Sequence, residues 1–372
     1  MVRPERILRR RRAHRGDRYN EGVERERGFR IDCTPDLIPG LDEARAAGLV
    51  PDVVFPDGFV VGDRSVESLD TVAVSVAEVR QLVAATRLPR WVIGKGSFGP
   101  GYVAVRALMR AKALTTVCEE AACPNISRCW SRGTATFMIA GENCTRGCRF
   151  CNVVSAKPLA PPDPDEPARV AEAAAAMGLR FVVVTAVARD DVPDGGAAHF
   201  VSTIAALRER LPEAKIEVLI PDLRGNWDAL DAIIEAAPDV LNHNTETVPR
   251  LYRRVRPGAR YERTLELLER GARAGLRTKS GIMVGLGERL PEVAQVFGDL
   301  AGVGCELVTV GQYLRPSADH LPVERFYAPT EYPALAALGR SLGLGHVEAG
   351  PLVRSSFEAD RVAEELPLPI AR

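Results

Sequence analysis

The stretch Thr136-Phe-Met-Ile-Ala-Gly-Glu-Asn-Cys144-Thr-Arg-Gly-Cys148-Arg-Phe-Cys151 decides how the rest of the sequence is interpreted. Its first five residues predict a buried strand that ends at a glycine, and three cysteines follow at the spacing Cys-x3-Cys-x2-Cys. Three thiolates this close together can hold three irons of a 4Fe–4S cluster, which leaves the fourth iron open to another ligand. The alternative is structural zinc, but zinc prefers four closed ligands, commonly from paired cysteine elements. The sequence therefore favours a cluster-binding loop.

Strand and helix patterns alternate from this stretch onward. Strands are predicted at 136–140, 181–184, 216–220, 239–241, 280–284 and 306–310, and helices at 166–177, 197–210, 227–236, 262–274, 290–300 and 330–341. Six such units predict a parallel sheet covered by helices, in the form of a partial, open-sided (βα)6 barrel. Polar residues follow each predicted strand. Because barrel chemistry lies on loops at the carboxyl ends of strands, we expect these groups on one face.

A second group of three cysteines, Cys118, Cys123 and Cys129, ends 15 residues before the first group. It could donate a fourth ligand to the first group, but two thiols would then have no role. Two separate three-cysteine sites account for all six. The second site also needs a fourth ligand, and neither remaining cysteine is a good candidate. Cys33 lies in an irregular segment, and Cys305 lies in an apolar strand, where a lone cysteine is usually a small buried hydrophobe.

Composition and charge exclude several classes of function. The 372 residues include 49 basic and 49 acidic side chains, so no net charge draws the chain to nucleic acid or acidic lipid. The sequence lacks the run of about 18 apolar residues that a spanning helix needs, and it has no apolar signal segment. Clustered thiols without such a signal favour metal or redox chemistry in the cytoplasm. An arginine run at 9–12, interleaved with acidic residues, predicts a solvated, largely disordered arm.

Taken together, the motifs resemble those of the radical S-adenosylmethionine enzymes, and specifically the lipoyl synthase family. The resemblance runs in unbroken order from Pro89 to Asp360. Besides the cysteine loop, it is carried by Thr116-Val-Cys-Glu-Glu-Ala121, Cys123-Pro-Asn125, Gly133-Thr-Ala-Thr-Phe-Met-Ile139, Arg189-Asp-Asp191, Asp194-Gly-Gly196, Asn242-His-Asn244, Glu246-Thr-Val248, Thr278-Lys-Ser-Gly-Ile-Met283, Gly285-Leu-Gly-Glu288, Gly311-Gln-Tyr-Leu314 and Gly350-Pro-Leu-Val-Arg-Ser-Ser356.

The resemblance implies two 4Fe–4S clusters and their ligands. The cluster that binds S-adenosylmethionine would be held by Cys144, Cys148 and Cys151, and an auxiliary cluster by Cys118, Cys123, Cys129 and Ser356. A serine oxygen is a harder ligand than a thiolate, so that corner would differ in lability from the others, as suits a cluster that is dismantled. Without the resemblance, Ser355-Ser356 would be interpreted as a helix cap.

The implied activity is that of a sulfurtransferase in the last step of lipoate biosynthesis. Two sulfur atoms from the auxiliary cluster would enter C6 and C8 of an octanoyl chain on a carrier-protein lysine, with two S-adenosylmethionine molecules consumed. The implied partners are octanoylated carrier domains (E2 subunits of 2-oxoacid dehydrogenases and the glycine cleavage H protein), a ferredoxin or flavodoxin reductant and an iron–sulfur cluster carrier. Two alternatives remain open: another sulfur-inserting radical enzyme with a different substrate, and a ferredoxin-like electron carrier.

Five further residues are expected to be catalytic: Arg189, Asp190, Asn244 and Glu246, which we expect at the barrel mouth, and Lys279. For the first four, the alternative is salt bridging at strand ends. Lys279 is one of only five lysines in an arginine-rich chain, which makes its place before a core strand suggestive, although an ordinary loop lysine fits nearly as well.

The sequence departs from the family pattern in two places. The family's usual Arg-Ser-Ser-Tyr-His-Ala-Asp is Arg354-Ser-Ser-Phe-Glu-Ala-Asp360 here, and Thr-Ser-Val-Asp-Arg-Asp-Asp is Thr185-Ala-Val-Ala-Arg-Asp-Asp191. The first change removes a phenol hydroxyl, and the second removes one hydroxyl and one carboxylate. We expect a poorly matched, partly disordered N-terminal extension at 1–88, the auxiliary cysteines in 89–133, the partial barrel at 134–345 and a C-terminal segment with Ser356 at 346–372.

Overall fold

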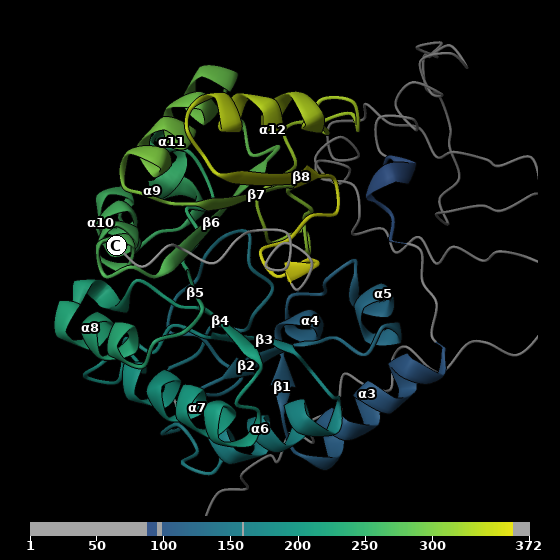
Figure 1. Ribbon diagram of the computed structural model, residues 1–372. Coiled ribbons are helices and arrows are strands. Elements are labelled where there is room, and N and C mark those ends of the chain that lie inside the picture. Colours follow the sequence, from purple (N-terminus) through teal and green to yellow (C-terminus); the bar gives the residue numbers. More distant parts are fainter. Residues whose placement is uncertain (1–87, 95–98, 158–159, 360–372) are drawn as a thin grey trace, which may run out of the picture. The chain divides into compact units, whose positions relative to one another are not determined.

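A sheet of eight strands forms the centre of the part of the chain that the computed structural model describes, residues 88–94, 99–157 and 160–359 (Figure 1). The strands are β1 (Thr115–Thr116), β2 (Thr136–Ile139), β3 (Phe181–Ala186), β4 (Lys215–Leu219), β5 (Val240–Asn242), β6 (Arg277–Val284), β7 (Leu307–Gln312) and β8 (His346–Gly350). They pair in chain order; β1 is antiparallel to β2, and every later pair is parallel. The arginine run at 9–12 and Cys33 lie outside the described residues.

The long helices in the connections between successive parallel strands lie on the outside of the sheet (Figure 1). The helices are α3 (Pro100–Ala111), α4 (Val117–Glu120), α5 (Ile126–Ser131), α6 (Glu166–Ala176), α7 (Ala197–Arg210), α8 (Trp227–Glu235), α9 (Tyr252–Val255), α10 (Tyr261–Arg273), α11 (Leu290–Gly302) and α12 (Tyr332–Ser341), with short 3-10 turns η3 (Arg90–Val92), η4 (Leu223–Gly225) and η5 (Pro249–Leu251). None of the helices within the described ranges is long and apolar enough to cross a membrane.

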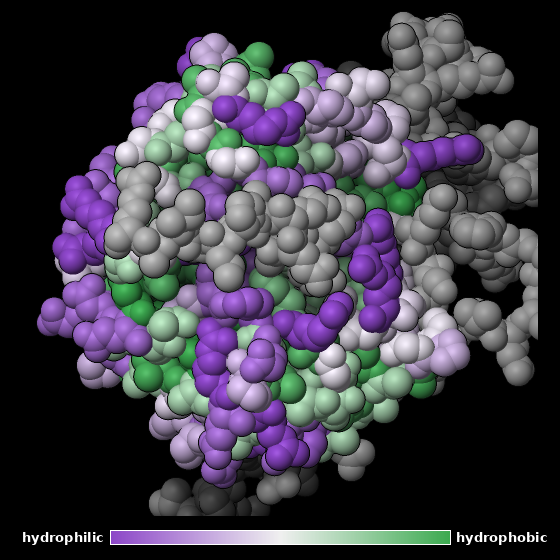
Figure 2. Space-filling model, in the orientation of Figure 1, coloured by the Kyte–Doolittle hydropathy of each residue, from purple (hydrophilic) through white to green (hydrophobic). Residues whose placement is uncertain are grey.

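Helix α10 shows how the sequence pattern fixes this packing. It buries Tyr261, Thr264, Leu268 and Gly271, three or four residues apart, on the face toward the sheet. A Cβ at Gly271 would lie 2.5 Å from a Leu241 methyl carbon, so a larger residue here would require the Leu241 side chain or the helix to shift. The opposite faces of α8 and α10 are hydrophilic (left side of Figure 2).

The six strands and six helices predicted from the sequence are confirmed, and with them the predicted fold class of a partial barrel. The structure adds β1 and β8, which were not predicted. β8 pairs in parallel with β7 through Val308 and Val347, so the sheet continues past residue 345, where the barrel was expected to end. Within the described residues no strand pairing joins β8 back to β1 or β2, which leaves the barrel open at that side.

Candidate active site

The loop that carries Cys144, Cys148 and Cys151 follows the carboxyl end of β2. The N–H of Cys144 donates to the Val154 carbonyl at 2.8 Å, and the Cys144 carbonyl accepts from the N–H of Ala156 at 3.1 Å. A one-residue bridge between Cys144 and Ser155 thereby pins the two ends of the loop together. The three cysteines therefore lie on a closed loop at the mouth of the barrel, as the sequence predicted.

Arg146, between the first two cysteines, fastens this loop to the next strands. Its Nε and Nη2 donate to the two carboxylate oxygens of Asp190, both at 2.8 Å, and Nη2 lies 2.6 Å from Asp222 Oδ1. Burial alone would raise the pKa of Asp222, but the hydrogen bond and charge of Arg146 outweigh it and lower the pKa to about 2. Asp190, predicted as catalytic, thus holds the cysteine loop in place.

The donor set of the loop suits a metal cluster. Cys144, Cys148 and Cys151 are free thiols and partly buried. Burial raises the pKa of Cys148 to about 11, against the opposing charge of Arg256, and that of Cys151 to about 12. Among the described residues, no group of three His, Cys, Asp or Glu side chains is arranged to hold a single metal ion. Bound metal deprotonates a thiol ligand outright, so these grouped thiols fit a site that is completed by metal.

A second polar group lies next to the loop at the barrel mouth. Asn244 Nδ2 donates to Ser355 Oγ at 2.6 Å and to Glu246 Oε1 at 3.0 Å, and Arg256 Nη1 donates to the Asn244 carbonyl at 2.6 Å. Burial raises the pKa of the Glu246 carboxyl group. The charge of Glu246 in turn raises the pKa of the Cys148 thiol. Asn244 and Glu246 were predicted here, and the structure brings them together with the C-terminal Ser355.

Arg189 is almost completely buried and forms several hydrogen bonds, as in the salt-bridging alternative. Its side chain is 2% exposed. Nη1 donates to the Ala140 carbonyl at 2.7 Å, Nη2 donates to the Ala160 carbonyl at 2.8 Å, and Nε and Nη2 bind Asp191 at 2.9 and 2.8 Å. Ala140 is the residue after β2 and has a left-handed φ of 64°. Arg189 thus fixes the strained turn that leads into the cysteine loop.

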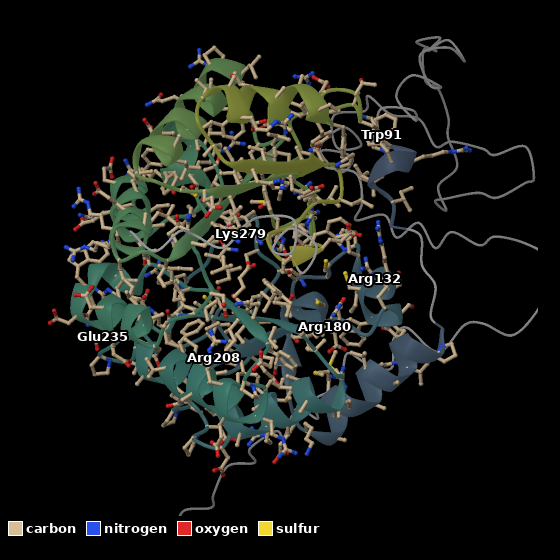
Figure 3. All side chains as sticks on the ribbon, viewed as in Figure 1. Trp91, Arg132, Arg180, Arg208, Glu235 and Lys279 are labelled. Carbon is tan, nitrogen blue, oxygen red and sulfur yellow. The ribbon has the colours of Figure 1, made fainter. Side chains whose placement is uncertain are left out.

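Lys279 is likewise engaged inside the barrel, near the centre of Figure 3. Its Nζ lies 3.0 Å from both carboxylate oxygens of Glu217, and Asn242 Nδ2 donates to the same carboxylate at 2.7 Å. The two charged side chains are only 3% and 1% exposed. This buried pair joins β4 to β6 across β5, which gives Lys279 a positioning role; its predicted catalytic role stays a prediction.

Glu217→Leu is expected to lower the free energy of unfolding by about 3–5 kcal/mol, because it leaves the Lys279 ammonium buried without a counter-charge. The double variant Glu217→Leu with Lys279→Met is expected to recover most of that loss, since it removes both charges. Urea unfolding of the two variants and the wild type measures the difference. A double variant as unstable as the single one would contradict the pairing.

The second three-cysteine group faces a pocket of its own. Cys118 lies in α4, Cys129 in α5 and Cys123 between them, and all three line a single pocket together with residues of β2 and of the C-terminal segment. Burial is the largest cause that raises the pKa of Cys118 to about 12 and that of Cys129 to about 11, and the neighbouring Cys123 raises both further. These thiols also form a compact donor set that metal would complete.

Ser356 is on the wall of this pocket, and its neighbour Ser355 is not. Ser356 Oγ accepts a hydrogen bond from Thr136 Oγ1 at 2.9 Å, whereas Ser355 Oγ pairs with Asn244 at the barrel mouth. Consecutive hydroxyls therefore serve different sites. Both are engaged by side chains of the barrel, which favours the site interpretation of this serine pair over the helix-cap interpretation.

Comparison with known proteins shows the family to which the chain belongs. Residues 138–300 match the Radical SAM superfamily. A lipoyl synthase of Methylococcus capsulatus is 51% identical over 303 residues, covering 81% of this chain and 92% of the relative. One of Nitrosococcus oceani is 50% identical over 312 residues, covering 83% and 96%. The chain belongs to the lipoyl synthase family. Among solved structures, Streptococcus suis SuiB bound to S-adenosylmethionine is similar with a TM-score of 0.46 at 11% identity, over 57% of this chain and 49% of that one.

Membership of the lipoyl synthase family confirms the family and the sulfur-inserting radical enzyme class predicted from the sequence. It also confirms the predicted cofactor types, 4Fe–4S clusters and S-adenosylmethionine, and the coarse substrate class of octanoylated carrier proteins. Cys305 is 3% exposed and its thiol donates to the Leu307 carbonyl at 3.4 Å, so it packs as the buried hydrophobe that the sequence predicted.

Three charged residues of this lipoyl synthase fold were not singled out from the sequence: Arg146, Glu217 and Arg256. Arg146 lies between two cysteines of the loop, so its position in the sequence could have marked it as a candidate site residue. Glu217 is a polar residue in an otherwise apolar strand, and its burial at 1% exposure indicates a charged partner. Arg256 follows α9 and gave no signal, because only the folded chain brings it to the Asn244 carbonyl.

Proposed function

We propose that the chain inserts two sulfur atoms at C6 and C8 of an octanoyl group on a carrier-protein lysine and so forms N6-lipoyl-lysine. One observation carries the proposal: the six clustered cysteines form two separate groups, one on a loop at the barrel mouth and one lining a pocket with Ser356. Radical generation and sulfur donation are different chemical tasks, and two cluster sites would allow each task its own cluster.

The proposed ligands follow from this division. Cys144, Cys148 and Cys151 would hold the cluster that binds S-adenosylmethionine; Cys118, Cys123, Cys129 and Ser356 would hold the auxiliary cluster. When bound, the first cluster would supply the electron for reductive cleavage of S-adenosylmethionine, and the second would supply sulfide. No acid or base side chain can break an unactivated C–H bond, so the reaction requires cofactors of this kind.

The protein's own contribution is positioning. Arg146, held by Asp190 and Asp222, keeps the cysteine loop at a fixed place on the barrel rim. Asn244 and Glu246 offer an amide and a partly buried carboxylate at the mouth, where the polar and cationic parts of S-adenosylmethionine need partners. We assign these two residues to binding, and we assign Arg189 and Lys279 to holding the strands that carry the site.

The proposal extends to partners and organisation. We propose as substrates the octanoylated E2 subunits of 2-oxoacid dehydrogenases and the glycine cleavage H protein. A ferredoxin or flavodoxin would supply electrons, and a cluster carrier would replace the auxiliary cluster after turnover. We also propose a cytoplasmic location and domain boundaries at 88 and 133. Because β8 (His346–Gly350) pairs with β7, we propose that the boundary expected at 345 lies after Gly350.

Anaerobic reconstitution is expected to yield about eight irons per chain, as two 4Fe–4S clusters. Turnover with an octanoylated carrier peptide, reductant and S-adenosylmethionine should give a product that has gained two sulfurs and lost two hydrogens. Iron analysis and mass spectrometry of the peptide measure both results.

Two outcomes would contradict the proposal. Full activity with one cluster per chain would rule out the auxiliary cluster as sulfur donor. An unmodified octanoyl peptide, alongside normal release of 5′-deoxyadenosine, would indicate a sulfur-inserting enzyme with a different substrate.

A further inference from the structure

Ion pairs link α5 and the residue after it to the C-terminal segment at the wall of the pocket lined by Cys118, Cys123 and Cys129. We propose that Glu358 is a positioning residue that, through Arg128 and Arg132, holds Ser356 against the three-cysteine pocket and so controls how readily this fourth ligand is released. The inference rests on the proposed auxiliary site. It concerns one of the two positions at which this chain departs from the family's Tyr-His pair, the positions of Phe357 and Glu358.

The contact joins two parts of the chain that lie far apart in the sequence. Arg132 Nη1 lies 3.1 Å from Glu358 Oε1, and Arg128 Nη2 binds the same oxygen. The Arg128 guanidinium also lies over the Phe357 ring, 5.1 Å from its centre. Figure 3 shows Arg132 next to α5. Phe357 and Glu358, which stand where the family has its Tyr-His pair, therefore both contact α5 through Arg128.

Two contacts, one before and one after Ser356 in the sequence, hold its segment against the region of α5. Asn125 Nδ2, just before α5, donates to the Leu352 carbonyl at 2.6 Å. Glu358 fastens the segment six residues later, and between them Ser356 accepts from Thr136. Segment 352–358 is thus fixed at both ends across the pocket, with the proposed ligand inside the span.

Charge explains why glutamate suits this position. Cys129 lies on α5, one residue after Arg128 and three before Arg132, so two guanidinium groups stand close to this proposed ligand. The Glu358 carboxylate therefore balances two cations next to a proposed ligand. A histidine at 358, the usual family residue, would meet two arginines and could supply no such balance.

The ion pairs between Glu358 and the two arginines are only partly shielded from solvent. The Arg128 and Arg132 side chains are 57% and 49% exposed, whereas Glu358 is 10% exposed. Ion pairs with one half-exposed partner are modest and weaken with salt. Glu358 also has a left-handed φ of 48°, which a residue with a Cβ adopts at a cost. Loss of the ion pair would therefore free the segment, as a sulfur-donating cluster requires once it is consumed.

The test compares full-length reconstituted wild type with Glu358→Ala and Glu358→Gln. Two readouts are used: amide hydrogen exchange of the peptide 352–359, where Phe357 N–H donates to the Arg354 carbonyl at 2.9 Å, and iron release to a chelator. Glu358→Ala is expected to speed both about tenfold, the scale of a lost charge-assisted hydrogen bond, with Glu358→Gln between it and wild type. Only half of the iron should respond. Glu324→Ala, which removes an exposed ion pair with Arg254 elsewhere, is the matched control and should change neither readout.

A charge exchange provides the rescue. Glu358→Arg alone should release iron fastest, and adding Arg128→Glu with Arg132→Glu should slow release again. Unchanged exchange in Glu358→Ala, or no recovery in the exchanged variant, would overturn the inference. A wild type with a single cluster would instead overturn the proposed function and the ligand role of Ser356, while the hydrogen-exchange result would still test the contact itself.

Discussion

Cys148→Ala is expected to abolish S-adenosylmethionine cleavage and to lower the iron content from about eight to about four per chain. The variant removes one of three thiols on the barrel loop, so the cluster proposed there loses a third of its protein ligands. The loop itself should persist, because the bridge between Cys144 and Ser155 and the ion pairs of Arg146 do not involve the Cys148 side chain. Iron analysis and 5′-deoxyadenosine formation measure the two effects.

Cys305→Ala is the matched control, since it also removes one thiol but from the buried start of β7. It should keep about eight irons and full cleavage activity, at a small cost in stability from the lost packing. Retention of S-adenosylmethionine cleavage in Cys148→Ala would remove the basis for assigning the radical site to this loop.

The regular part of the fold was predictable because most of its strand residues are apolar. Segments such as Phe181–Val184 and Ile216–Ile220 are bounded by turn residues and alternate with amphipathic helices, which specifies parallel βα units. β8 was missed because His346–Gly350 has a single strongly buried residue, Val347, and owes its strand form to the β7 edge beside it. β1 is only two residues long, too short for a periodic pattern.

The cysteine groups were predictable from spacing alone, whereas the roles of the charged residues were not. A sequence shows that Arg189 and Lys279 stand at strand ends, but it does not show what occupies their charges. In the structure Arg189 binds two carbonyls and Asp191, and Lys279 pairs with Glu217, 62 residues earlier in the chain. Such partners come from tertiary packing, so residue type and position alone could not show which charges are already paired within the fold.

The two adjacent serines give the sharpest test of the auxiliary site. Ser356→Ala is expected to leave 5′-deoxyadenosine formation within about twofold of wild type while it lowers lipoyl product at least about tenfold. The Ser356 hydroxyl lines the pocket with Cys118, Cys123 and Cys129, and its removal leaves that cluster without the proposed fourth ligand. Product analysis and nucleoside quantification in the same reaction measure both values.

Ser355→Ala is the matched control, because it deletes the same hydroxyl one residue away. Ser355 pairs with Asn244 at the barrel mouth, so its loss should weaken S-adenosylmethionine cleavage and leave the auxiliary iron in place. Opposite effects of two neighbouring substitutions would show that the C-terminal segment serves both sites, one hydroxyl to each. Equal sulfur insertion by Ser356→Ala and wild type would refute the ligand role, and the division of labour between the two serines with it.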